Sequence, residues 1–210
     1  MPPRSAALTC LLALALAVGE AWGEEPTPPK ASGQVAFSVA GGGAFGAVPI
    51  FGGVSESGRQ AAFFELQMHR SLKRTASLEI EYLFALVPLE LQGATLVREG
   101  EQERRVTSHA AGFDPLGLRF VFPGGAFRPF GMARGGIRFF DEVVPEPRGT
   151  RLNFVAELGV GLSRRLGGAY DAWLGLTLHH VSNANRGVKN YGINQFALNL
   201  GLLWRRRAAR

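Results

Sequence analysis

Residues 152–162 have the sequence LNFVAELGVGL, which holds the clearest structural pattern of the chain. Its even-numbered positions are all apolar, whereas most of its odd-numbered positions hold Asn, Glu or Gly. Because successive side chains of a β-strand point to opposite faces, a period of two predicts a strand with one apolar face. A length near ten residues suits a tilted strand that crosses the hydrocarbon layer of a membrane.

The same alternation recurs in seven other segments, which together with residues 152–162 predicts eight strands. A change of phase at Gly135-Gly136 in the fifth segment predicts a β-bulge there. The other seven apolar rows are Val35, Phe37 and Val39; Phe64, Leu66 and Met68; Leu78, Ile80, Tyr82, Phe84 and Leu86; Leu116, Leu118, Phe120 and Phe122; Phe130, Met132, Ile137 and Phe139; Leu174, Leu176 and Leu178; and Phe196, Leu198, Leu200, Leu202 and Trp204.

The opposite face of each segment is small or polar. Eight strands enclose an interior that is only wide enough for side chains, so these residues fit inside and the bulky rows face lipid. We therefore predict an all-β fold, an eight-stranded antiparallel up-and-down transmembrane β-barrel. A soluble, lipocalin-like barrel with the two faces exchanged, acting as a periplasmic ligand carrier, is the alternative. In the membrane barrel a structural network is expected among Glu79, Glu81, Glu157, Arg119, Arg134 and Arg138.

The start of the 210-residue chain is expected to lie outside the barrel. Residues 1–23 combine a basic first part, an apolar run and small residues before a predicted cleavage site, which is the pattern of a signal peptide. Residues 24–32 are Pro-rich and predict a flexible lead-in. The barrel is predicted over residues 33–210. Since Cys10 falls in the signal peptide, a disulfide-stapled scaffold and a Cys-based metal site are excluded.

The connections between the predicted strands alternate in length. Four of them are long, namely Ala44 to Arg59, Val87 to Gly112, Asp141 to Thr150 and Asn183 to Tyr191, and three are short, namely Ser71 to Arg74, Pro123 to Arg128 and Arg164 to Gly168. Outer-membrane barrels have short periplasmic turns and longer external loops, so the alternation predicts a location in the bacterial outer membrane. The net charge of +6 then favours anionic lipid over nucleic acid as the partner.

A histidine and a serine stand near the external end of the seventh strand. His180 and Ser182 are two residues apart, so they share a face, and that face carries the leucine row directed at lipid. An imidazole beside a hydroxyl can take its proton, which is what nucleophilic catalysis requires. In a hairpin of strands seven and eight, Asn194 falls opposite His180 and could hold its tautomer. The pattern predicts a serine-esterase site on the lipid-facing wall.

The sequence HVSNA at residues 180–184, followed by NYGIN at residues 190–194, resembles the signature of the lipid A 3-O-deacylase (PagL-type) family. That family consists of eight-stranded outer-membrane barrels that remove an ester-linked acyl chain from lipid A. The resemblance covers about the last 30 residues. It implies His180 as general base and Ser182 as nucleophile.

The resemblance also implies an oxyanion hole formed with Asn183 and the backbone at Asn185. Two positions depart from the family pattern. The family has Glu where this chain has Asn194, and Gly where this chain has Asn185. An amide still orients an imidazole but stabilises imidazolium less, so a slower enzyme is expected.

Other residues near the motif are open to two interpretations. Arg186 and Lys189 could bind the phosphates of lipid A, or they could simply be solvated loop residues. His179 points into the lumen and is expected to be structural. The sequence predicts no metal site and no cofactor. The expected partner is lipid A, or lipopolysaccharide, of the outer leaflet, and a homodimer is left open.

A non-catalytic outer-membrane barrel with a structural or adhesive role is the alternative function. Its main support is Asn194, which stands where a catalytic carboxylate is expected.

Overall fold

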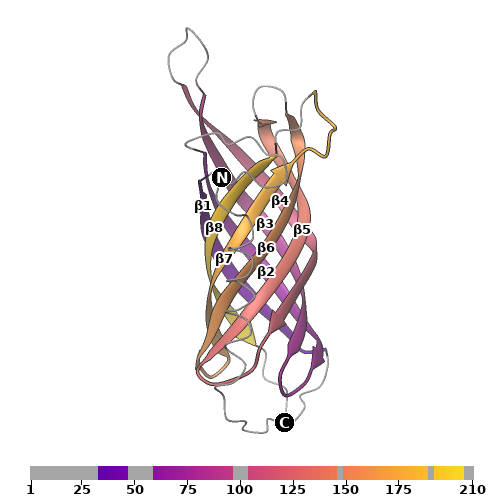
Figure 1. Cartoon of the computed structure of the whole chain (residues 1–210), viewed down its shortest axis with the longest axis vertical. Helices are drawn as coiled ribbons and strands as arrows, with labels where there is room; N and C mark the ends of the chain where they lie inside the picture. Colours follow the sequence, from indigo (N-terminus) through magenta and orange to yellow (C-terminus); the bar gives the residue numbers. More distant parts are fainter. Residues whose placement is uncertain (1–32, 47–58, 97–103, 146–148, 189–191, 206–210) are drawn as a thin grey trace, which may run out of the picture.

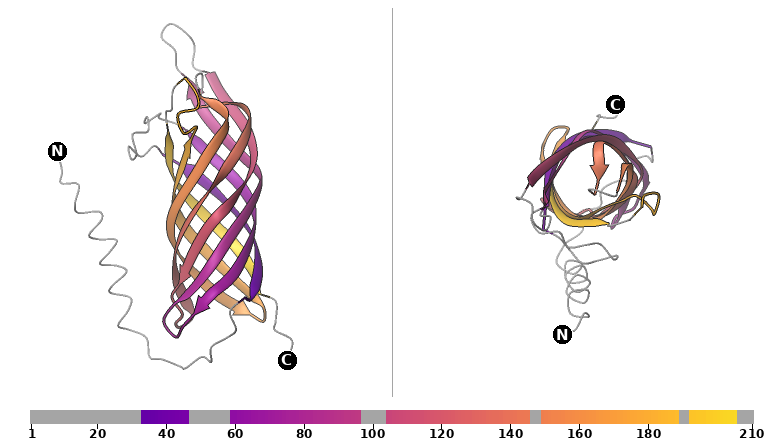
Figure 2. Two further views of the ribbon diagram at one scale, coloured as in Figure 1. Left: turned by 90° about the vertical axis from the view of Figure 1, so that its right-hand side faces the viewer. Right: turned by 90° about the horizontal axis from the view of Figure 1, so that it is seen from above.

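Eight antiparallel strands form a closed barrel in the computed structural model, which describes residues 33–46, 59–96, 104–145, 149–188 and 192–205. Each strand pairs with the next, and β8 pairs with β1 to close the ring (Figure 1 and Figure 2). The predicted fold is confirmed. The strands are β1 (Val35–Phe45), β2 (Gln60–Arg74), β3 (Glu79–Leu96), β4 (Arg104–Val121), β5 (Phe127–Val144), β6 (Thr150–Gly167), β7 (Tyr170–Ser182) and β8 (Ile193–Arg205).

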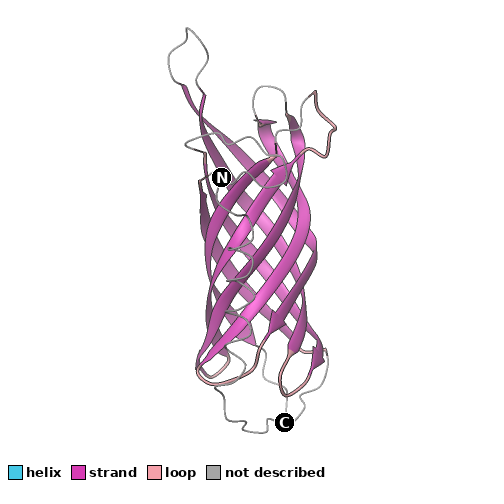
Figure 3. Ribbon diagram, viewed as in Figure 1, coloured by secondary structure: helices cyan, strands magenta, loops and turns pink. Residues whose placement is uncertain are grey.

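All regular elements of the described residues are strands, as Figure 3 shows. Within the described ranges no helix is long and apolar enough to span a bilayer. The predicted signal peptide, residues 1–23, and the predicted lead-in, residues 24–32, lie outside the described residues.

The bulky rows point outward from the barrel. Leu116, Leu158 and Leu200 are 74%, 65% and 65% exposed, whereas the Ser and Glu residues of the opposite face are buried. A soluble protein rarely exposes an apolar surface of this extent, but a membrane barrel presents one to lipid. The soluble, lipocalin-like alternative is therefore wrong.

The predicted bulge at Gly135-Gly136 is wrong. β5 pairs with β6 without a register shift from Phe127 to Phe139, so the inward and outward faces keep one phase. Phe130 and Met132 consequently point into the lumen and are 3% and 5% exposed, although their size predicted an outward position.

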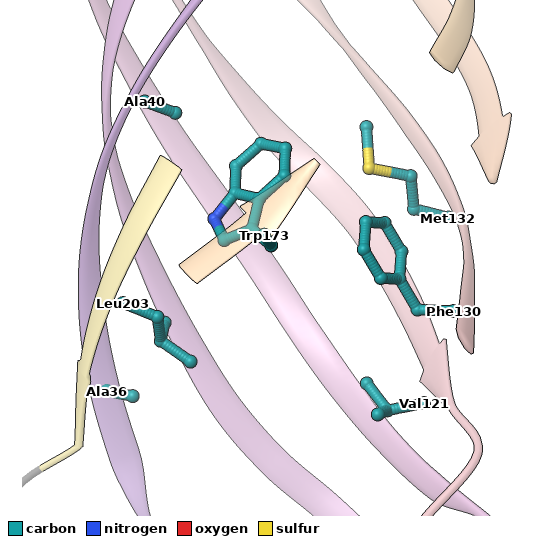
Figure 4. Close-up of a cluster of buried hydrophobic side chains, with 7 residues drawn as sticks. All are labelled: Ala36, Ala40, Val121, Phe130, Met132, Trp173 and Leu203. Carbon is teal, nitrogen blue, oxygen red and sulfur yellow. The ribbon is translucent and has the colours of Figure 1, made fainter. Parts of the chain in front are cut away.

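Glycine on the neighbouring strand makes room for the inward Phe130. A Cβ atom at Gly161 would lie 2.4 Å from Phe130 Cζ, so the phenyl ring occupies the space that a larger residue would need. Phe130 also packs edge-on against Trp173, with 6.0 Å between the ring centroids, as Figure 4 shows. Large and small side chains alternate across the lumen and fill it.

The irregularity that the sequence suggested for β5 lies in β4 instead. Its register against β5 shifts between Phe113 and Leu116, a segment that contains Pro115. Proline has no N–H to donate to the ladder, which favours a bulge. The hydroxyl of Tyr82 on β3 donates to the Pro115 carbonyl oxygen at 2.6 Å and so satisfies this acceptor.

β3 and β4 are longer than predicted. Most of the predicted loop from Val87 to Gly112 is strand, because β3 continues to Leu96 and β4 begins at Arg104. The loop-side ends of β3 and β4 lie at the top of the barrel in Figure 1. At the other end, the predicted turn at Ser71 to Arg74 is also strand, and the chain turns between Thr75 and Leu78.

Charged side chains cross the lumen in a hydrogen-bonded network. Arg134 donates through Nε to Glu157 Oε2 at 2.6 Å and through both terminal nitrogens to the Glu65 carboxylate. Glu157 also contacts His179 Nδ1 at 2.7 Å, which agrees with a structural role for that histidine. The predicted partnership of Arg134 with Glu157 is confirmed.

Two further arginines of the predicted network are buried in the lumen. Arg119 donates to Glu81 at 3.1 Å, as predicted. Arg138 pairs with Glu90 at 2.7 Å and with Asp114. Neither acid belongs to the predicted network, and Glu90 lies in the stretch that the sequence predicts as a loop.

Replacing Arg134 with methionine is expected to destabilise the barrel strongly. The substitution keeps a long side chain but leaves Glu65 and Glu157 without their shared cation. Removing one partner of a buried ion pair costs about 3–5 kcal/mol of unfolding free energy. Urea unfolding in detergent, monitored by heat-dependent gel migration, should show a lower urea concentration at the unfolding midpoint. The exposed Arg151 of β6 is the control, and an Arg151→Met midpoint that falls as far would contradict the role of the network.

Candidate active site

The β7–β8 hairpin brings His180 and Asn194 together. They are directly paired across the two strands, which is the register that the hairpin predicted. His180 Nδ1 lies 2.6 Å from Asn194 Oδ1. Because an amide oxygen only accepts, this contact requires a proton on Nδ1 and directs the lone pair to Nε2. Asn194 is only 3% exposed, so the contact is shielded.

His180 and Ser182 lie on the outer face of the wall. Both are half-buried, whereas the intervening Val181 is buried and points into the barrel. On the neighbouring strand β6, His180 is paired with Ala156 and Ser182 with Phe154. The two polar side chains therefore end the lipid-facing row of β7, next to the loop that follows Ser182.

The loop after Ser182 has an unusual backbone. Asn183 is fully buried, and its carbonyl oxygen accepts a 3.1 Å hydrogen bond from the Arg186 N–H. Ala184 and Asn185 have φ angles of 50° and 61°, in the left-handed region that most side chains avoid. Asn adopts this conformation more readily than other non-glycine residues, so Asn185 can have the left-handed backbone conformation that glycine favours.

Arg186 lies beside the same outer face. Its guanidinium carbon is 5.2 Å from the centroid of the Phe154 ring, and Phe154 is the β6 partner of Ser182. Arg186 therefore lies against the β6 residue that is paired with Ser182. Lys189 lies outside the described residues, so its position is not part of this geometry.

The sequence of residues 64–202 matches the family model described as lipid A 3-O-deacylase (PagL), over more than half of the chain. The chain belongs to this family. The match runs from β2 into β8 and includes His180, Ser182 and Asn194. Membership of the lipid A 3-O-deacylase family supports a hydrolase activity on lipid A. No curated protein matches the chain in sequence.

Solved outer-membrane barrels have the same fold. The crystal structure of the outer membrane enzyme PagL superposes with a TM-score of 0.55 and 21% identity, covering 79% of this chain and 97% of that one. The outer membrane protein OprG from Pseudomonas aeruginosa gives a TM-score of 0.52 and 12% identity, covering 84% and 97%. The family and these barrels locate this lipid A 3-O-deacylase family member in the bacterial outer membrane.

The lumen of this deacylase family member holds a serine–histidine contact that the sequence did not reveal. Ser38 Oγ lies 2.9 Å from His69 Nε2, and His69 Nδ1 lies 3.4 Å from Glu81 Oε2. The three residues come from three strands, and only the register between the strands brings them together.

The lumenal contact is unsuited to attack on a lipid. Ser38 donates its single hydroxyl proton to Gln67 Oε1 at 2.8 Å, so this proton is not directed at His69. Ser38, His69 and Glu81 are 4%, 2% and 1% exposed. The adjoining cavity, lined by Gln67, His69, Leu83, Arg119, Phe130, Met132 and Trp173, has a volume of about 10 Å³, room for one water molecule.

Proposed function

We propose that the protein is an outer-membrane serine esterase that hydrolyses an ester-linked acyl chain of lipid A. Ser182 is the nucleophile, His180 the general base and Asn194 the residue that orients the base. The observation that carries the proposal is the 2.6 Å contact between His180 and Asn194, two residues from Ser182, on the lipid-facing wall of a lipid A 3-O-deacylase family member.

The reaction begins with the transfer of a proton from Ser182 to Nε2 of His180. Asn194 Oδ1 accepts a hydrogen bond from the Nδ1–H of His180 and thereby keeps Nε2 as the nitrogen that takes the proton. The Ser182 oxygen attacks the ester carbonyl, and the imidazolium returns the proton to the sugar oxygen as the acyl–oxygen bond breaks. Water, deprotonated by His180, then attacks the acyl-serine and releases the fatty acid and the restored hydroxyl of Ser182.

The loop after Ser182 supplies donors for the negative oxygen of the tetrahedral intermediate. The Asn183 side chain and the backbone N–H of Asn185 are the proposed donors. Groups held in place before the reaction stabilise developing charge without reorganising, and the left-handed conformation of Ala184 and Asn185 supports such a fixed loop.

The substrate lies against the outer wall with its acyl chains along the leucine row. Its phosphates would then meet the basic residues beyond the strand ends. Arg186, beside Phe154, is the proposed phosphate partner, and Lys189 is the second. This arrangement needs no diffusion of lipid out of the membrane.

Lipid A mass spectrometry tests the proposed function. A Gram-negative host that expresses the full chain is expected to contain lipid A lighter by one ester-linked acyl chain, whereas the host with an empty vector keeps the parent mass. Heat-dependent gel migration verifies that the barrel has inserted. An unchanged lipid A spectrum in the presence of a folded barrel would contradict the esterase.

A further inference from the structure

Gly192 stands between the external loop and the first residue of β8, and it is buried. Its φ angle lies outside the left-handed region, so the backbone at this position could belong to any residue. Conformational freedom therefore does not explain why glycine occurs here.

The side chain of His180 fills the space next to Gly192. A Cβ atom at Gly192 would lie 2.7 Å from His180 Cε1, 3.5 Å from Nδ1 and 3.7 Å from Nε2. Real Cβ atoms essentially never approach another heavy atom within 3.0 Å. These three nearest atoms all belong to one imidazole ring, so the missing methyl group makes room for that ring.

Two contacts thus fix the imidazole. Asn194 holds it through Nδ1 at 2.6 Å, and Gly192 lies against the carbon between the two ring nitrogens. Asn194 is the second residue of β8 and Gly192 directly precedes that strand, while His180 is on β7. A ring confined at Nδ1 and Cε1 has little freedom to turn Nε2 away from the position that Ser182 needs.

We infer that Gly192 is a positioning residue for His180, because its lack of a side chain lets the imidazole occupy the orientation bonded to Asn194. The effect on the ring is independent of the reaction, whereas the effect on catalysis rests on the proposed function. The obstructed atoms belong to a side chain, so a methyl group at residue 192 displaces the imidazole while the barrel keeps its fold.

The Gly192→Ala variant tests this inference, with Gly43→Ala as the matched control. A Cβ atom at Gly43, on the outer face of β1, would meet nothing closer than the Ala61 carbonyl oxygen at 3.6 Å, an ordinary contact. The chain has 4 histidines, so the Cε1–Hε1 cross-peaks in a carbon–proton NMR spectrum of the full chain in micelles are few. The His180 peak is the one that disappears in His180→Gln.

In Gly192→Ala the His180 peak is expected to move while those of His69, His109 and His179 stay in place, and in Gly43→Ala none should move. With purified lipid A in micelles, Gly192→Ala is expected to lower kcat by about 100-fold with an unchanged KM, since a displacement near 1 Å has that effect on catalysis. A His180 peak that keeps its wild-type position in Gly192→Ala would overturn the inference.

The NMR measurement also separates the two proposals. If the wild-type protein does not deacylate lipid A, the proposed function fails, but the His180 peak still decides whether Gly192 positions the ring. If the wild type is active and the His180 peak is unmoved in Gly192→Ala, the inference alone fails.

Discussion

Replacement of Ser182 by alanine is expected to abolish deacylation of lipid A while the barrel still folds. The substitution removes the attacking oxygen, and loss of a catalytic nucleophile lowers kcat by about a thousandfold or more. The side chain is half-buried on the outer face, where loss of a hydroxyl group facing lipid has little effect on stability. Lipid A from the Ser182→Ala strain should have the parent mass.

Ser38→Ala is the matched control for this prediction. Ser38 also contacts a histidine, His69, at 2.9 Å, but the pair lies in the lumen beside a cavity of about 10 Å³. Its loss should leave the deacylation of lipid A unchanged and affect only the stability of the barrel. Activity that persists in Ser182→Ala but disappears in folded Ser38→Ala would move the active site to the lumen.

Replacement of Asn194 by a carboxylate is expected to raise kcat. When His180 takes the proton of Ser182, the imidazolium is stabilised more by a carboxylate than by an amide. A hydrogen bond to a charged group is worth about 1 kcal/mol more than one between neutral groups, which corresponds to roughly fivefold in rate. Asn194→Asp has the same length, so it preserves the geometry of the 2.6 Å contact with His180.

Two companion variants complete this experiment. Asn194→Leu keeps the branching and the number of side-chain heavy atoms but removes the acceptor, so the tautomer of His180 is no longer fixed and kcat should fall well below that of the wild type. Asn194→Glu restores the residue type of the family. A wild-type protein without activity that becomes active only as Asn194→Glu would favour a non-catalytic barrel with a structural or adhesive role. A kcat that is equal in all three variants would show that residue 194 does not orient the base.

Alternation with a period of two was enough to predict the barrel, the number of strands and the outward face, because each strand has one side in lipid and one in the lumen. The pairing of His180 with Asn194 was also predictable, because antiparallel pairing keeps the sum of the paired residue numbers constant along β7 and β8. Side-chain size alone predicted that Phe130 and Met132 face lipid, which is wrong. A large residue can face inward where a glycine such as Gly161 stands beside it, and that compensation appears only when the strands are aligned.

Other features depend on packing between distant strands. Glu90 meets Arg138 only because β3 extends beyond its predicted end, and Asp114 lies in the β4 irregularity that the sequence did not predict. The approach of Gly192 to His180 and the left-handed conformation of Asn185 involve distances and angles that a residue pattern does not specify. The triad-like contact of Ser38 in the lumen likewise requires the register of β1, β2 and β3.

The ion pairs of Arg134 have a consequence for the permeability of the cell envelope. Arg134 on β5 bonds both Glu157 on the adjacent β6 and Glu65 on β2, which lies on the far side of the ring. The axial route through the protein is therefore obstructed at this level by side chains that hold one another. A barrel closed in this way can present polar residues such as His180 and Ser182 on its lipid-facing surface without forming a pore for ions or antibiotics.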